Sequence, residues 1–345
     1  MTSSPGTATR IHCCGRWSTT ARGTGRRSQN AAYRGHLDVV QWLIEAGADV
    51  NTADPRDGYT PSTSAAESGH LAVVVRLIDA GADVNKAHAV DDGCTPLFSA
   101  ADWGYLAVVE RLIDARAAVN QGRNDNGATP LHIAAQLGHL DVVERLIAAG
   151  VDVGISLTDT GATPVFIAAY YGQLRVVERL IAAGADISTA STDNGYTPFF
   201  AAAEQGHLDV VERLIAGSGV DINTVDTDGD TPLHGAAQQG NLDVLVRLIA
   251  VPEVDVNKAN KDGDTPLSIA LALGHNGMAQ TLRAAGANEP HGVDAARHIK
   301  GGSSRTKRSH HDRRRAPASM TAIHVQRRDA ISRVGRPRRR PPQRQ

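Results

Sequence analysis

Apolar residues after Gly127 fall into two short groups at helical spacing, with one glycine between the groups and another after them. The first group shares one face of a predicted short helix and consists of Leu131, Ala134 and Ala135. The second follows the i, i+3, i+4 spacing of an amphipathic helix and consists of Val142, Val143, Leu146 and Ile147. Gly138 and Gly150 suit the ends of these helices, because glycine adopts a left-handed conformation without strain. The pattern predicts a helix–turn–helix unit.

This unit returns along most of the chain. The dipeptide Thr-Pro occurs seven times, and its threonines are Thr60, Thr95, Thr129, Thr163, Thr197, Thr231 and Thr265. The successive gaps are 35 residues and then 34 residues five times. Threonine is a good helix N-cap, and proline fits the first helical position because no partner is needed there for its missing N–H. One such unit cannot bury its own apolar face, so the fixed period predicts a stack of repeats.

The recurring pattern Gly-x-Thr-Pro-Leu-x-x-Ala-Ala-x-x-Gly-His-Leu-x-Val-Val-x-x-Leu-Ile-x-x-Gly-Ala-Asp-Val-Asn resembles the ankyrin repeat from about residue 26 to 288. The resemblance implies an all-α repeat fold, an α-solenoid of about eight helix–turn–helix units with β-hairpin fingers along one edge. The first unit is degenerate, because Arg26 and Arg27 stand where the register predicts Thr-Pro. Members of this family usually bind other proteins through the fingers and first helices, and most have no catalytic activity.

Charge divides the chain into an acidic body and basic ends. Residues 31–290 hold 15 basic and 34 acidic residues, whereas residues 291–345 hold 16 basic and 3 acidic residues. We expect a repeat domain over 26–288, a disordered basic N-terminal segment over 1–25 and a disordered Arg-rich tail over 289–345.

The tail carries two basic clusters, Lys307-Arg308 with Arg313–Arg315 and Arg338–Arg340. Such clusters are typical of nuclear import signals and nucleic-acid contacts. A solvated charged tail or an error in the gene model is the plainer interpretation. A third hypothesis is that the basic tail folds back on the acidic body and screens its binding face.

The repeats depart from the usual period of 33 residues by one extra residue. In the first five linkers this residue lies between Asp-Val-Asn and Thr-Pro, as between Asn51 and Thr60. In the last two it follows the second helix, near Gly217-Ser218-Gly219 and Val251-Pro252-Glu253. Neutral loop insertion explains this, and a fingertip surface shaped for a partner is the alternative.

Two substitutions predict a weak point in the second and third repeats. Arg116 stands where other repeats have the glycine that ends the second helix, and it should cost about 1 kcal/mol through backbone strain. Ser62 replaces the apolar residue that other first helices carry. At the other end of the stack, Arg283 replaces the usual isoleucine, as expected for a solvated outer face.

Aromatic residues collect at positions that do not build the repeat core. These are the residue before Thr-Pro and the two residues before the next glycine, and they include Tyr33, Tyr59, Trp103, Tyr170, Tyr171 and Tyr196. Tyrosine and tryptophan dominate interaction hot spots because they are large and rigid with one polar end. We expect this concave face to bind a protein. The alternative is partial burial against the adjacent repeat.

Acidic residues follow the same edge, among them Asp230 and Asp264, and also Asp57, Asp91, Asp92, Asp125, Asp193, Asp228 and Asp262. Their summed charge favours a partner with a basic segment, mainly through faster association. Ordinary turn chemistry is the alternative for each single residue, since Asp suits tight turns beside glycine.

No residue pattern predicts catalysis. The histidines that follow the turn glycine recur with the repeat, so we expect them to be hydrogen-bonded within the turn; they are His36, His70, His139, His207 and His275. His132 and His234 follow Thr-Pro-Leu and are expected to be structural too. We expect no enzyme activity, no cofactor and no metal site. His12-Cys13-Cys14 lacks a second ligand pair at a usable spacing.

The function predicted from the sequence is therefore a scaffold or adaptor for protein–protein interaction. The alternative is a regulatory inhibitor or nuclear cofactor whose Arg-rich tail mediates nuclear import or nucleic-acid contact. We expect a monomer in the cytoplasm or the nucleus, without a membrane span, in which nucleic acid is contacted through the tail alone.

Overall fold

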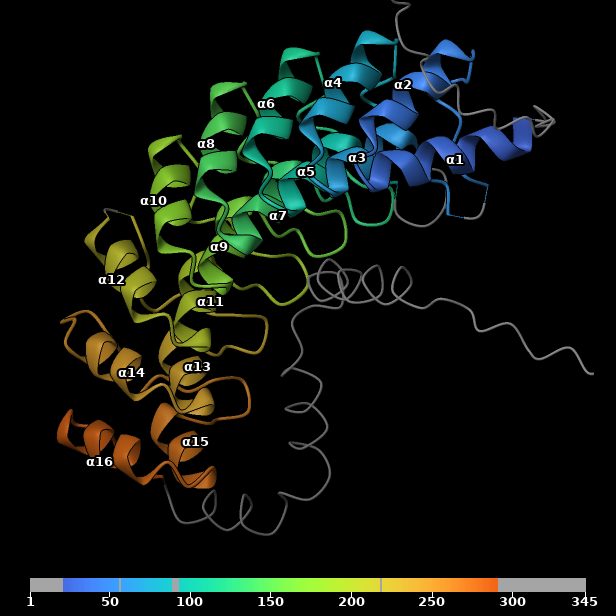
Figure 1. Ribbon diagram of the computed structural model, residues 1–345. Coiled ribbons are helices and arrows are strands. Elements are labelled where there is room, and N and C mark those ends of the chain that lie inside the picture. The colour runs from blue at the N-terminus through green and yellow to red at the C-terminus, as the bar shows by residue number, and fades with distance from the viewer. Residues whose placement is uncertain (1–20, 56, 89–92, 218, 291–345) are drawn as a thin grey trace, which may run out of the picture.

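The computed structural model describes residues 21–55, 57–88, 93–217 and 219–290. Within these ranges the chain forms sixteen helices, arranged as eight pairs along a curved stack (Figure 1). The first helices of the pairs, the inner helices, are α1 (Ala21–Tyr33), α3 (Pro61–Glu67), α5 (Pro96–Asp102), α7 (Pro130–Leu137), α9 (Pro164–Tyr170), α11 (Pro198–Gln205), α13 (Pro232–Gln239) and α15 (Pro266–Ala272). The second helices, the outer helices, are α2 (Leu37–Glu45), α4 (Leu71–Asp79), α6 (Leu106–Asp114), α8 (Leu140–Ala148), α10 (Leu174–Ala182), α12 (Leu208–Ala216), α14 (Leu242–Ile249) and α16 (Asn276–Ala284). The predicted all-α repeat stack is confirmed.

The Thr-Pro pairs begin the inner helices as predicted. Six of the seven threonine hydroxyls accept a hydrogen bond from the backbone N–H three residues later, as Thr60 does from Thr63 at 3.1 Å. In α7 the Thr129 hydroxyl instead lies 2.8 Å from Nδ1 of His132. Gly138 follows α7 at φ 74°, the left-handed conformation that glycine was expected to supply.

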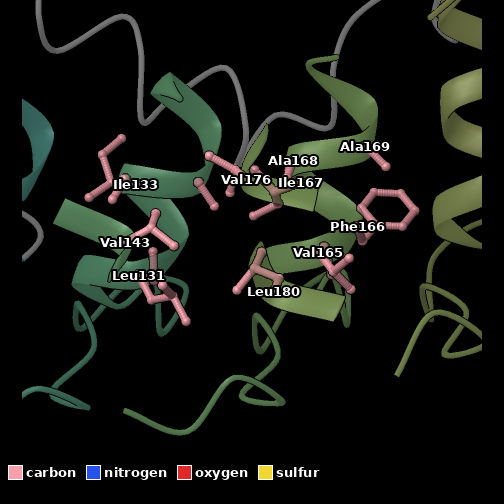
Figure 2. Packing of buried hydrophobic residues seen from close by; sticks show 14 of the residues in the cluster. Leu131, Ile133, Val143, Val165, Phe166, Ile167, Ala168, Ala169, Val176 and Leu180 are labelled. Atoms are coloured by element: carbon pink, nitrogen blue, oxygen red, sulfur yellow. The ribbon is translucent and has the colours of Figure 1, made fainter. Parts of the chain in front are cut away.

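The core is one cluster that runs from Ala31 to Leu282. Alanines on the inner helices, such as Ala134 and Ala168, are completely buried, which lets neighbouring helices approach closely. Figure 2 shows how Leu131 and Val143 of one repeat and Val165 of the next line this cluster. The stack is therefore held by side chains from adjacent repeats rather than by any single helix pair.

A ladder of polar bonds also joins most repeats to the preceding one. Nε2 of His139 lies 3.2 Å from the Asp102 carbonyl, and Nε2 of His207 lies 3.0 Å from the Tyr170 carbonyl. Because a carbonyl only accepts, the ring nitrogen carries the proton in both bonds. Gln173 makes the equivalent bond to its preceding repeat. The prediction of bonds within the turn was wrong for these histidines, since their rings reach the adjacent repeat.

Alanine at Gly172 is expected to destabilise the protein by about 1 kcal/mol more than alanine at Gly184. Both glycines have a positive φ, of 70° and 88°, so each substitution carries a backbone strain of about 1–2 kcal/mol. A Cβ at Gly172 would lie 2.5 Å from the ring of His207, whereas a Cβ at Gly184 would meet nothing within 4 Å. Urea titrations of the two variants measure the difference, and equal losses would contradict a structural role for the ladder.

The fingers between repeats are turns, and the described residues contain no strand, so the expected β-hairpins are not confirmed. Two backbone bonds close most fingers, as from Arg123 N–H to the Ala128 carbonyl at 3.0 Å and from Gly127 N–H to the Arg123 carbonyl at 3.1 Å. The last two fingers close over a shorter span, as from Asp226 N–H to the Asp230 carbonyl at 2.9 Å. This difference matches the predicted shift of the extra residue away from the last two fingers.

Arg116 has a φ of 65°, which makes it the non-glycine residue with a positive φ among the described residues. Its side chain is exposed, so nothing in the packing requires arginine here. We expect Arg116→Gly to raise the free energy of unfolding by about 1 kcal/mol through relief of this strain. A thermal melt of the variant checks this, and an unchanged or lower midpoint would contradict it.

Ser62 is buried, as is Ser64 two residues later, and neither hydroxyl has a hydrogen-bond partner. This finding supports the predicted weak point in the second repeat. At the N-terminus, α1 begins at Ala21, so five residues of the expected disordered segment are helical. At the C-terminus, Arg283 is exposed and pairs with Glu289.

Several predictions fall outside the described residues. They concern the segment 1–20 with His12-Cys13-Cys14, the acidic residues Asp91 and Asp92, and the tail over 291–345.

Candidate protein-binding surface

One side chain in each of the first seven repeats, seven residues after the threonine position, lies at the end of an inner helix. We call these residues the inner row, which consists of Tyr33, Glu67, Asp102, Gln136, Tyr170, Glu204 and Gln238. The ladder holds the backbone at several of these positions, because the carbonyls of Tyr33, Asp102 and Tyr170 each accept a bond from a histidine of the next repeat. These positions lie on the inner helices, which follow one another along the curved stack in Figure 1.

Glu67 is the electrostatic centre of the inner row. Burial raises the pKa of its carboxyl to about 7, and the nearby charges of Asp102 and Asp57 act in the same direction. His88 acts in the opposite direction. Asp57 and His88 belong to fingers and Asp102 to the next inner helix, so Glu67 lies in the angle between fingers and helices. Negative charge is concentrated there.

Tyr170 lies at the same position in the fifth repeat and forms an aromatic group. Its ring centroid is 5.1 Å from that of Tyr171 and 6.5 Å from that of Phe166. Burial raises the pKa of the Tyr170 phenol far above its usual value, and the charge of Glu204 adds to this. Burial also raises the pKa of Tyr171 to about 12 and, with the charge of Glu67, the pKa of Tyr33. These phenols stay protonated and remain hydrogen-bond donors.

The structure places the other aromatic candidates differently. Tyr196 is 8% exposed, lies 4.1 Å from the Phe200 ring and donates its hydroxyl to Glu204 at 3.2 Å. It supports the wall of the inner face and leaves little surface for a partner. Tyr59 stacks on His88 at 4.8 Å, and Trp103 is half-buried. The structure thus separates Tyr33 and Tyr170, in the inner row, from Tyr196, in the core.

Asp230 and Asp264, two of the acidic residues expected to attract a basic partner, make hydrogen bonds within the fingers and to neighbouring residues. Asp230 is 6% exposed and accepts a hydrogen bond from Nδ2 of Asn260 at 2.6 Å. Asp264 accepts a hydrogen bond from Ser268 at 3.1 Å. Burial raises the pKa of the neighbouring Asp226 to about 6. Turn chemistry accounts for these contacts, so these residues shape the fingers.

Glu67 and Asp102 were missed among the sequence candidates. The signal that identifies them is the register: both occupy the position held by Tyr33 and Tyr170 in other repeats. In the part of the chain that the structure covers, no group of three histidine, cysteine, aspartate or glutamate residues is placed to hold a metal ion. Nor is any helix there long and apolar enough to cross a membrane.

Comparison with protein families agrees with this geometry. The family model described as ankyrin repeats in three copies matches residues 29–122, 85–157, 116–191, 139–226 and 199–291, which together span most of the chain. The chain belongs to the ankyrin repeat family. A search of curated proteins returns no match. Ankyrin repeats are generally protein–protein interaction modules, and the inner row lies on the inner helices of this ankyrin stack, beside its fingers.

Proposed function

We propose that this ankyrin repeat protein is a scaffold that binds a basic segment of a partner protein along the inner row. The observation that carries the proposal is the position of the half-buried Glu67 near the carboxyls of Asp102 and Asp57, where burial and these charges raise its pKa. Crowded, half-buried carboxyls repel one another, and an approaching Lys or Arg relieves that repulsion. The aromatic group at Tyr170 adds a rigid apolar contact farther along the same row.

The capture of partners by matched variants tests this proposal. One variant carries Glu67→Gln, Asp102→Asn and Tyr170→Ala, and its control carries Glu110→Gln and Asp141→Asn on the exposed face of the outer helices. We expect quantitative mass spectrometry to show at least one partner with a basic segment that the inner-row variant loses and the control retains. Equal capture by both variants would contradict the proposal.

Binding of the captured basic segment is expected to strengthen about tenfold from pH 6 to pH 8. A cation favours the charged form of Glu67, so its binding lowers the pKa from about 7 and releases a proton. Isothermal titration at the two pH values measures this change. In the Glu67→Gln variant the affinity should vary little with pH, and an equally strong dependence there would assign the effect to another group.

No described contact favours the regulatory or nuclear alternative, because the basic clusters lie within 291–345. Location in the cytoplasm or nucleus is likewise proposed from the sequence. Imaging of the full chain and of a chain truncated after residue 290 tests it: exclusion from the nucleus on truncation alone would favour the alternative.

A further inference from the structure

The outward face of the first repeat exposes apolar side chains whose equivalents in the later repeats are buried against the preceding repeat. Val39 of α2 is 40% exposed, whereas its equivalents Val73, Val108, Val142, Val176, Val210 and Val244 are at most 1% exposed. Trp42, one helical turn further along α2, is 61% exposed. Together Val39 and Trp42 form what we call the N-terminal face.

In later repeats the position of Trp42 contacts the preceding repeat. Arginine occupies it in every later outer helix except α16, and Arg111 pairs with Asp79 at 3.2 Å while Arg145 pairs with Asp114 at 3.0 Å. The N-terminal face is thus a repeat-stacking surface on which the described residues place no further repeat.

At the opposite end of the stack, the described residues include an exposed Leu273 but no apolar side chain at the outer-helix position that Trp42 would meet. Arg283 replaces the isoleucine that other outer helices carry there, and its side chain pairs with Glu289. Ser268 of α15 occupies the position held by Phe166 and Phe200 in α9 and α11. Head-to-tail stacking of two chains would therefore place Trp42 on a charged pair, which is unfavourable.

The N-terminal face is complementary to itself. On α1 the exposed residues of this end are Arg26, Arg27 and Asn30, and Asn30 matches a position that contacts the preceding repeat elsewhere, as Gly235 does with Glu204. On α2 the acidic Glu45 is exposed beside Trp42. The helices of a pair run antiparallel, so the start of α1 is level with the end of α2. A two-fold axis along the pair places Arg26 opposite Glu45 and Trp42 of a second copy.

We propose that the N-terminal face binds a second copy of this chain in a two-fold, face-to-face dimer, α1 of each copy lying on α2 of the other. Isologous contacts of this kind close after two subunits. Apolar contact of Val39 and Trp42 drives the association, and the basic α1 against the acidic end of α2 selects the orientation.

Sedimentation equilibrium of the full chain tests the proposal. We expect a reversible two-chain species at micromolar concentrations, with dissociation constants raised about tenfold or more by Trp42→Arg, which restores the residue type of other repeats. Val246→Arg is the matched control, because Val246 is 49% exposed on α14 away from this end. It should leave the dimer unchanged. A single-chain species at about 100 µM, or equal effects of both variants, would overturn the proposal.

A charge reversal tests the orientation. Arg26→Glu should weaken the dimer about tenfold, because the two-fold axis repeats the repulsion from Glu45 at a second place. Adding Glu45→Arg to the same chain should restore the dissociation constant to within about threefold. Failure of this rescue, with circular dichroism unchanged, would overturn the arrangement of α1 on α2.

Discussion

Replacing Glu67 with Gln is expected to raise the free energy of unfolding at pH 8 by about 2–3 kcal/mol. Burial holds the pKa of Glu67 near 7 in the folded chain, against 4.5 for an ordinary glutamate. A raised folded pKa favours folding below pH 4.5 and loses that contribution as the pH rises through 7. Glutamine imitates the protonated carboxyl, so the gain should be large at pH 8 and near zero at pH 4.5.

Urea unfolding of the wild type and the Glu67→Gln variant at both pH values measures this effect. Glu110→Gln provides the control, because Glu110 is exposed on α6, and it should change stability little at either pH. A gain for Glu67→Gln that is the same at pH 4.5 and pH 8 would show that packing, rather than charge, explains it.

The result would also bear on function. Glu67 lowers the free energy of unfolding at physiological pH, and a single substitution is expected to raise it. Such residues are typical of binding surfaces rather than of the structural core. The same variant is expected to bind the basic partner more weakly. Stability and affinity should therefore move in opposite directions.

The second large effect concerns His132. Between pH 7.5 and pH 4.5 the wild type is expected to lose about 2–3 kcal/mol more stability than a His132→Phe variant. Burial lowers the pKa of His132 to about 4, although the carbonyls of Ala162 and Ile155 favour the charged ring. In the unfolded chain His132 takes up a proton near pH 6.5, whereas in the folded chain it stays neutral until about pH 4. The free energy of unfolding therefore falls as the pH drops from 6.5 to about 4.

Phenylalanine is the suitable replacement because α5, α9 and α11 carry it at this position, as Phe98 does. Glu67 and Asp226 have raised pKa values and oppose the trend, but they are present in both proteins and cancel in the difference. Urea unfolding across the pH range gives that difference. Parallel curves for the two proteins would mean that His132 is charged in the fold or reachable by water.

The helices and their ends could be predicted from the sequence because local interactions determine them. Thr60 caps α3 through a bond to Thr63, and Gly138 ends α7, and both depend on a few adjacent residues. The strain at Arg116 was predictable for the same reason. The fingers were less predictable: the family resemblance implied hairpins, but the backbone bonds within each described finger close a turn and form no strand.

The binding surface was predicted only in part because its geometry depends on contacts between repeats. Tyr196 and Tyr59 occupy the same position before Thr-Pro, yet Tyr196 turns inward onto Phe200 whereas Tyr59 stacks on His88 of the next finger. Glu67 gains its unusual pKa from neighbours in two other segments. Residue type identified aromatic candidates, but only the assembled stack brings the acidic ones together.

The most direct test of the proposed binding surface is hydrogen exchange of the full chain with and without its captured partner. The account predicts slower exchange in the fingers and at the ends of α3, α5 and α9, with α4, α6, α8 and α10 unchanged. Slower exchange in the outer helices alone, or no change in exchange in either set of helices, would contradict it.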